Sequence, residues 1–140
     1  MYTKILVAIE NSAADRAVLQ HVEGLVNLTG AELLLVHVAD GFAARHFNDL
    51  ELRESEVIRD DRAYLERLCE DMTGRGMRCG ARLAMGDPAT ELVRVAAEEQ
   101  VDLIAMSTHG HRFLQDLLRG STADRVRHHV SIPVLMVRAK

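Results

Sequence analysis

The chain has 140 residues, enough for one domain with a hydrophobic core, and its 48% hydrophobic content is typical of a globular protein. Aromatic residues make up 4%, with no Trp, which argues against a flavin pocket or a base-stacking nucleic-acid surface. The net charge of −4 gives no general attraction to nucleic acid or to an anionic membrane. No apolar run approaches the ~18 residues of a membrane span or resembles a signal sequence, so we expect a cytoplasmic protein.

Charge is distributed unevenly along the chain. Residues 107–140 have a net charge of +4, which leaves −8 for the rest. The basic members of this segment are Arg112, Arg119, Arg125, Arg127, Arg138 and Lys140. Two interpretations stay open: solvated helix faces, or a local field that attracts an anion.

The first elements predicted are a strand, a helix and a second strand. Residues 4–9 (KILVAI) form a short apolar run, which suits a buried parallel strand. In the helix that follows, Ser12 and Asp15 resemble a capping box, in which the Ser12 hydroxyl accepts the Asp15 amide hydrogen. Gly30 is a natural stop for that helix. Residues 31–38 (AELLLVHV) are the second strand.

A long charged helix is predicted in the middle of the chain. Residues 39–54 are expected to be irregular, and the helix spans roughly residues 50–73. Its apolar stripe consists of Val57, Ile58, Leu65, Leu68 and Met72. Glycines 74 and 76 end this helix.

The remaining elements alternate in the same way. Residues 77–85 form a third strand, and Asp87 is the N-cap of the next helix, with Pro88 in its first turn. The last three elements are a strand at 101–107, a short helix at 121–130 and, after it, a strand at 133–137. Five strands that alternate with helices indicate a single α/β domain over residues 1–140, with a doubly wound, mainly parallel five-stranded sheet and helices on both faces. Ligands in such folds bind beyond the carboxyl ends of the strands, where the strand order reverses.

Several catalytic motifs are absent from the sequence. Lysine occurs only at Lys4 and Lys140, which excludes a GxxxxGK[ST] phosphate loop. The turn after the first strand contains no glycine, which excludes a GxGxxG fingerprint there. Neither GxSxG nor HExxH occurs. Cys69 and Cys79 lack metal-ligand spacing and are interpreted as free thiols.

The histidines do not predict a metal site. His109 and His111 form an HxH pair in a loop, whereas His128 and His129 are neighbours on a helix and point apart. We interpret the second pair as favourable contacts with a helix C-terminus.

The stretch from residue 105 to 126 carries the clearest functional signal. Gly110 follows the fourth strand, and Gly120 with Ser121 and Thr122 begins a helix. Free amide hydrogens and the positive dipole end at that start suit an anion, and Arg112 lies in the span between the glycines. The alternative is a turn glycine followed by an ordinary Ser N-cap.

The chain resembles the universal stress protein family over nearly all of its length. The segments that carry the resemblance are KILVAIENSAADRAVLQHV, LLLVHV, GDPATELVRVAAEEQVDLIAMSTHG and GSTADRVRHHVSIPVLMV. In the family's ATP-binding branch the motif is Gly, two residues, Gly, nine residues, then Gly and Ser or Thr. Gly110, Gly120 and Ser121 match it, and Ser107 stands where the first glycine is expected. The resemblance implies a Rossmann-like sheet of order 3-2-1-4-5.

The resemblance also implies a nucleotide site for ATP, with or without Mg²⁺. The glycine motif would hold the phosphates, Glu10 would hold the ribose where the family usually has Asp, and the Val38 backbone would meet the adenine. The expected nucleotide-binding residues are Ala8, Ile9, Glu10, Val38, Ser107, His109, Gly110, Arg112, Gly120, Ser121 and Thr122.

Three functional hypotheses stay open. The first is a cytoplasmic, nucleotide-binding, regulatory or stress-response protein without catalytic residues. The second is a nucleotide-free, dimeric interaction protein of the same fold, which Ser107 and Phe113 favour because both are larger than the family's residues. The third is a slow nucleotide hydrolase, for which His109 and His111 are the only candidate groups. Residues 131–140 form an apolar edge segment, and the resemblance implies a homodimer through this C-terminal strand. Neither a nucleic acid nor a membrane is an expected partner.

Overall fold

The computed structural model describes residues 1–40, 47–108 and 122–139. Strands and helices alternate along these residues, as the sequence predicts. The elements are β1 (Lys4–Ile9), α1 (Ala14–Thr29), β2 (Glu32–Asp40), α3 (Phe47–Gly74), β3 (Cys79–Gly86), α4 (Pro88–Glu98), β4 (Leu103–Thr108), α6 (Thr122–His129) and β5 (Val134–Arg138).

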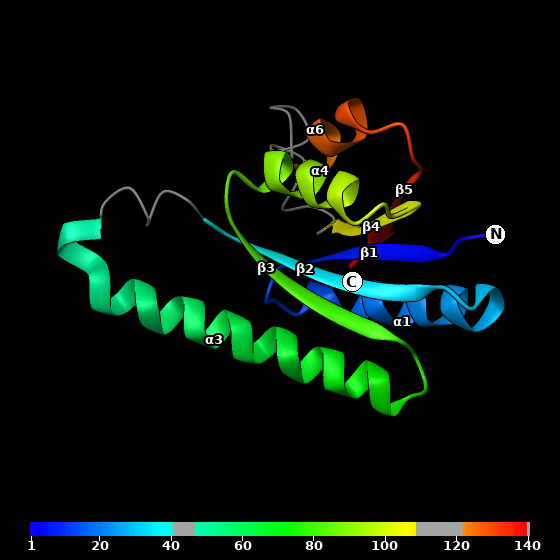
Figure 1. Ribbon diagram of the computed structural model, residues 1–140, viewed down its shortest axis with the longest axis horizontal. Helices are drawn as coiled ribbons and strands as arrows, with labels where there is room; N and C mark the ends of the chain where they lie inside the picture. The colour runs from blue at the N-terminus through cyan, green and yellow to red at the C-terminus, as the bar shows by residue number, and fades with distance from the viewer. Residues whose placement is uncertain (41–46, 109–121, 140) are drawn as a thin grey trace.

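The five strands form one sheet in the order β3-β2-β1-β4-β5, and every neighbouring pair is parallel. This confirms the predicted architecture and strand order. Helices α1 and α3 cover one face of the sheet, and α4 and α6 cover the other (Figure 1). The strand order reverses between β1 and β4, so the carboxyl ends of these two strands form the switch point at which ligands of such folds bind.

Two apolar cores lie on the two faces of the sheet. Alternate residues of β1 point to opposite sides, so Ile5 and Val7 enter the core under α1 and α3, whereas Leu6 and Ala8 enter the core under α4 and α6. Residues 5–9 are all at most 8% exposed, which is the burial expected of a central strand covered on both faces.

Most predicted element ends are confirmed. Gly30 ends α1 in the left-handed conformation at φ 73°, and its N–H donates to the Val26 carbonyl. The Asp87 side chain caps α4 by accepting from the Thr90 N–H, and Pro88 is the first residue of that helix. At the end of α6, the His129 Nδ1 lies 2.7 Å from the Arg125 carbonyl oxygen, which confirms the predicted contact with a helix C-terminus for His129. The His128 Nε2 instead lies 3.7 Å from an Asp124 carboxylate oxygen.

The long helix departs from the prediction in two ways. Helix α3 begins at Phe47, inside the segment expected to be irregular, because helix starts without a strong cap residue leave little signal in a sequence. Leu65 and Met72 are buried as predicted, but Val57 is 56% exposed. Val57 and Ile58 are neighbours and therefore lie about 100° apart around the helix axis, so only one of them can face the sheet. No helix in the described ranges has the length and apolarity that crossing a membrane requires.

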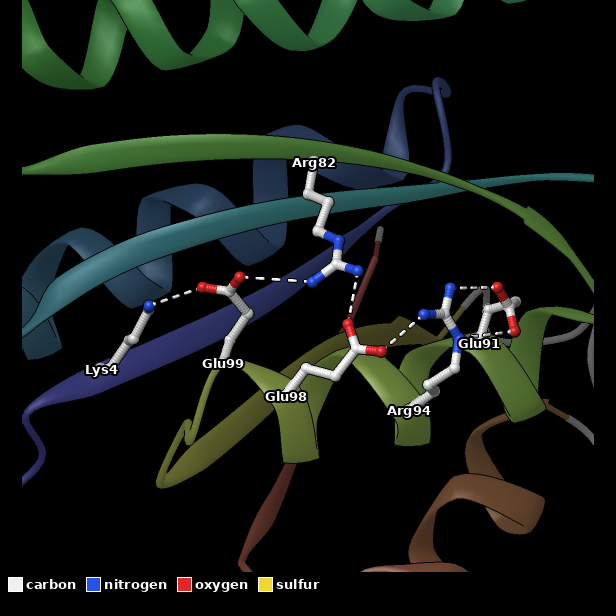
Figure 2. Close-up of polar contacts among 6 residues, drawn as sticks. All are labelled: Lys4, Arg82, Glu91, Arg94, Glu98 and Glu99. Atoms are coloured by element: carbon white, nitrogen blue, oxygen red, sulfur yellow. Dashed lines mark hydrogen bonds and ion pairs between the residues drawn. The ribbon is translucent and has the colours of Figure 1, made fainter.

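Charged side chains connect helix α4 to strands β1 and β3 (Figure 2). The members of this chain of contacts are Lys4, Arg82, Glu91, Arg94, Glu98 and Glu99. Glu99, at the end of α4, accepts from Lys4 of β1 at 2.8 Å and from Arg82 of β3 at 3.3 Å. Exposed ion pairs contribute little stability one by one. The contacts join the end of α4 to the sheet, while its N-terminus lies at the carboxyl end of β3, two residues after that strand.

Candidate functional site

The turn that leaves β1 is closed around one carboxylate. Asp15, at the start of α1, is 1% exposed. Its two oxygens accept the backbone N–H groups of Glu10, Asn11 and Ser12 at 2.8, 2.9 and 3.1 Å. Three successive N–H groups that converge in this way form an anion-binding concavity. In this chain an internal carboxylate occupies it.

The predicted capping box is half correct. The Asp15 carboxylate does reach back to the Ser12 N–H, as the motif requires. The Ser12 hydroxyl, however, accepts from the Ala14 N–H at 3.2 Å, and the Asp15 N–H donates to the Ser12 carbonyl instead. The Asp15 carboxylate binds three N–H groups of the turn, and α1 begins at Ala14, one residue later than it would with Ser12 as the N-cap.

A polar cluster around two buried carboxylates, Asp15 and Asp61, connects this turn with α3. The Tyr64 hydroxyl of α3 donates to Asp15 at 2.7 Å, and the Asn11 side-chain amide donates to Asp61 of α3 at 2.8 Å. Burial, and then the hydrogen bond to the Asp15 carboxylate, raise the pKa of the Tyr64 phenol. The phenol therefore stays protonated and remains a donor at neutral pH.

His37 of β2 completes the cluster. Its Nδ1 lies 2.7 Å from the Ile9 carbonyl oxygen, and its Nε2 lies 3.2 Å from an Asp61 carboxylate oxygen. Both neighbours are acceptors, so the ring donates to both only when both nitrogens carry hydrogen. The cluster of Asn11, Asp15, His37, Asp61 and Tyr64 is called here the turn anchor.

Sequence reasoning missed most of the turn anchor. His37 lies within an apolar strand run, and Asp61 and Tyr64 lie on a helix whose many charged residues hide a buried carboxylate. The sequence signal was a histidine between Val36 and Val38, inside an apolar run of the kind that is buried on both faces of a sheet.

The carboxyl end of β4 lies beside β1 at the switch point. Register pairs Val7 with Ala105, two residues before Ser107. Ser107 pairs with Val137 of β5. Its hydroxyl oxygen is buried and, within the described part of the chain, has no hydrogen-bond partner. An unsatisfied buried hydroxyl is costly to a fold and calls for an explanation at this position.

The other predicted site residues are distributed as follows. Ala8 and Ile9 are buried on opposite faces of β1, and Glu10 follows them as an exposed residue whose carboxylate accepts from the Ser12 hydroxyl at 3.2 Å. Val38 does not end the second strand, because β2 continues to Asp40.

Thr122 is the first residue of α6 and is half-buried. His109, Gly110, Arg112, Gly120 and Ser121 lie outside the described residues.

An ion pair connects the starts of two helices on the α4 face. Arg125 of α6 donates to both oxygens of Asp87 at 3.0 and 2.8 Å. Hydrogen bonds from Arg125 and then from Thr90 hold the pKa of the Asp87 carboxyl well below its usual range. The pair places the first turn of α6 next to the N-cap of α4. Among the described residues, no three His, Cys, Asp or Glu side chains gather as a metal-binding group would.

A sequence model of the universal stress protein family matches residues 1–138. The chain belongs to the universal stress protein family. It is 27% identical to the universal stress protein MJ0577 of Methanocaldococcus jannaschii, with 100% of this chain and 97% of that protein covered. It is 30% identical to the universal stress protein YxiE of Bacillus subtilis, with 99% and 100% covered. The predicted family membership is therefore confirmed.

Solved structures agree with this assignment. The structure of MJ0577 superposes with a TM-score of 0.84 at 28% identity, with 100% of this chain and 98% of that chain covered. A universal stress protein in complex with cAMP matches with a TM-score of 0.73 at 19% identity, with 98% and 97% covered. The Archaeoglobus fulgidus universal stress protein in complex with dAMP matches with a TM-score of 0.72 at 22% identity, with 97% and 98% covered. At these lower identities the last two show the fold alone.

Proposed function

We propose that this universal stress protein binds a nucleotide, ATP first among the candidates, at the carboxyl ends of β1 and β4 and acts as a cytoplasmic regulatory or stress-response module. The observation that carries the proposal is the Ser107 hydroxyl, which is buried at the switch point without a hydrogen-bond partner among the described residues. A ligand hydroxyl or phosphate oxygen that reached this oxygen would satisfy it.

The residues present fit such a ligand. The anion concavity after β1 is filled by Asp15, so phosphates belong on the other strand of the switch point, at the segment between β4 and α6. There Gly110, Gly120, Ser121 and Thr122 would hold them. Glu10 would hold the ribose at the end of β1, and the Val38 backbone would face the adenine.

The ligands bound in related structures indicate which ligand class should be tested first. Two universal stress proteins of this fold hold cAMP and dAMP, which makes an adenine nucleotide the ligand class to test first. In the proposal Mg²⁺ binds only together with ATP, because the ATP phosphates supply part of the Mg²⁺ coordination shell.

Calorimetric titration tests the proposal. The protein is stripped of metal and of copurified nucleotide, then titrated with ATP with and without Mg²⁺, beside Gly120→Glu and Gly24→Glu variants. Gly120→Glu adds a side chain and a negative charge at the proposed phosphate site. Gly24 is an exposed glycine of α1, and a Cβ added there meets no atom within 4 Å, so Gly24→Glu adds the same charge without crowding.

We expect micromolar ATP binding that Gly120→Glu abolishes and Gly24→Glu retains. Absence of binding by the unmodified protein contradicts nucleotide binding, and the chain is then a nucleotide-free interaction protein. Equal binding by both variants keeps the ligand but moves it away from Gly120.

We also propose that two copies pair through β5. This strand lies at the edge of the sheet, and its Met136 side chain is 39% exposed. A bare edge with an apolar side chain favours pairing with a second strand. Size exclusion with light scattering should show a dimer at micromolar concentration, and Met136→Lys should shift it toward monomer. A monomeric unmodified protein removes this part of the proposal.

A further inference from the structure

We infer that Asp61 of α3 is a positioning residue for nucleotide binding, because through His37 and Asn11 it holds the β1–α1 turn that presents Glu10. The inference rests on the proposed function, and it adds a helix that lies outside the predicted site. Asp61 touches no ligand in this account and acts through the turn.

Burial first singles out Asp61. Only Asp15 and Asp61 are buried charged side chains in the described part of the chain, at 1% and 7% exposure. A carboxylate removed from water persists only when donors replace its hydration. Asp15 has its donors within its own turn and from Tyr64, whereas Asp61 has its donors from two other elements, the turn and β2.

The contacts of Asp61 restrain Glu10 from both sides in the sequence. On one side, His37 holds the Ile9 carbonyl at 2.7 Å, and Asp61 holds the other ring nitrogen at 3.2 Å. On the other side, Asn11 donates its side-chain amide to Asp61 at 2.8 Å. Glu10 lies between these two restrained residues.

The conformation of Asn11 directs its side chain into this contact. Asn11 has φ 62°, in the left-handed region that Asn adopts more readily than most non-glycine residues. Asp15 holds the Asn11 backbone N–H from within the turn, and Asp61 adds a hold on the Asn11 side chain from outside it. Removing the Asp61 carboxylate takes away the partner of the Asn11 side-chain amide and of the His37 Nε2, and the Glu10 carboxylate then samples more positions.

A less restrained Glu10 should weaken the contacts between the protein and the ribose of the nucleotide. The test measures affinity for ATP and for 2′,3′-dideoxy-ATP, which lacks the hydroxyls that Glu10 would hold. The variants are Asp61→Ala, Asp61→Asn, Glu10→Gln and the double variant Glu10→Gln/Asp61→Ala. Asp60→Ala is the matched control, because Asp60 is the exposed neighbour of Asp61 on the same helix.

We expect Asp61→Ala to weaken ATP binding about tenfold and dideoxy-ATP binding far less. Asp61→Asn should stay within about twofold of the unmodified protein, because an amide can accept from Asn11 and donate to the Nε2 of a neutral His37 ring. Asp61→Ala should have no further effect once Glu10 is changed to Gln, and Asp60→Ala should have none.

Equal losses for the two ligands, or effects of Asp61→Ala and Glu10→Gln that simply add, overturn the inference. So does the same loss in Asp60→Ala.

If the unmodified protein binds neither nucleotide, the proposed function has failed, and hydrogen exchange examines the anchor itself. The amides of Glu10, Asn11 and Ser12 should exchange faster in Asp61→Ala than in Asp60→Ala. Unchanged exchange means that Asp61 does not hold the turn.

Discussion

The two strand ends that meet at the switch point differ in how completely their polar groups are satisfied. After β1, the three backbone donors of the turn have a partner: Asp15 accepts all three N–H groups and is itself fixed by Tyr64. At the end of β4, the buried Ser107 hydroxyl has no partner among the described residues. The polar groups after β1 are satisfied within the fold, whereas in our proposal a ligand satisfies the Ser107 hydroxyl at the end of β4.

The difference separates two roles, supporting the ligand site and binding the phosphates, which in many doubly wound proteins belong to the same turn. In a glycine-rich dinucleotide fold, the turn after the first strand binds the phosphates itself. Here that turn holds an internal anion, so a second anion at the same place meets a like charge in a buried setting. The turn therefore serves as a rigid support, and phosphate binding is left to the side of β4 and α6.

The largest expected effect comes from removing the internal anion. Asp15→Ala leaves three backbone N–H groups and the Tyr64 hydroxyl without their acceptor, and should lower the free energy of unfolding by about 4 kcal/mol. Asp15→Asn keeps one acceptor oxygen, and its stability should lie between that of Asp15→Ala and that of the unmodified protein. Urea unfolding measures both. A loss of under about 1 kcal/mol in Asp15→Ala means that the turn does not depend on this carboxylate.

A smaller loss of stability is expected when Tyr64, the side-chain donor to Asp15, is changed. Tyr64→Phe removes the hydroxyl that donates to Asp15 and should lower the free energy of unfolding by about 1.5 kcal/mol. The Asp15 oxygens keep their backbone donors, so the variant should fold normally. Combining Tyr64→Phe with Asp15→Ala should cost less than the sum of the two single changes, and full additivity would falsify the contact.

Acid should weaken the ion pair between α4 and α6. The pKa of Asp87 is lowered in the folded state, so Asp87 contributes stability above its unfolded pKa and loses that contribution as the pH falls through the folded value. Asp87→Asn keeps a capping oxygen but loses the charge that pairs with Arg125, so it should cost up to about 1 kcal/mol near pH 7, and this cost should shrink steadily below about pH 4. Urea unfolding of both proteins from pH 7 to pH 3 measures the difference. A difference that stays constant or grows on acidification contradicts the assignment.

The smallest expected change in the free energy of unfolding concerns the carboxyl end of β4, and it is an increase instead of a loss. Ser107→Ala removes a buried hydroxyl without a partner among the described residues, so it should leave the free energy of unfolding unchanged or raise it by about 0.5 kcal/mol in the absence of ligand. The same change should weaken ATP binding. A loss of stability in the ligand-free protein means that the hydroxyl already has a partner and that our reason for placing a ligand there is wrong.

Much of the fold was predictable because its signals are local. The alternation of apolar runs and helical patterns predicted the five strands, and the Asp87–Pro88 pair predicted the start of α4, since a cap and a proline act within one turn. The stripe of α3 was partly wrong at Val57, because neighbouring apolar residues leave the helix rotation ambiguous.

The turn anchor could not be predicted in the same way. Asn11, His37 and Asp61 are separated by 26 and 24 residues, and only tertiary packing brings their polar atoms together. A buried carboxylate on a helix rich in Asp, Glu and Arg looks like its exposed neighbours in sequence. The family motif did point to Ser107, but as a departure from glycine; the finding that its hydroxyl has no partner among the described residues required coordinates.

Amide hydrogen exchange with and without ATP, read by NMR, tests the central claim most directly. We predict that ATP increases protection within residues 107–124 and leaves the amides of Glu10, Asn11 and Ser12 unchanged, because these three already donate to Asp15. ATP-dependent protection at those three amides, with none within residues 107–124, would place the phosphates on the β1 turn and contradict the account.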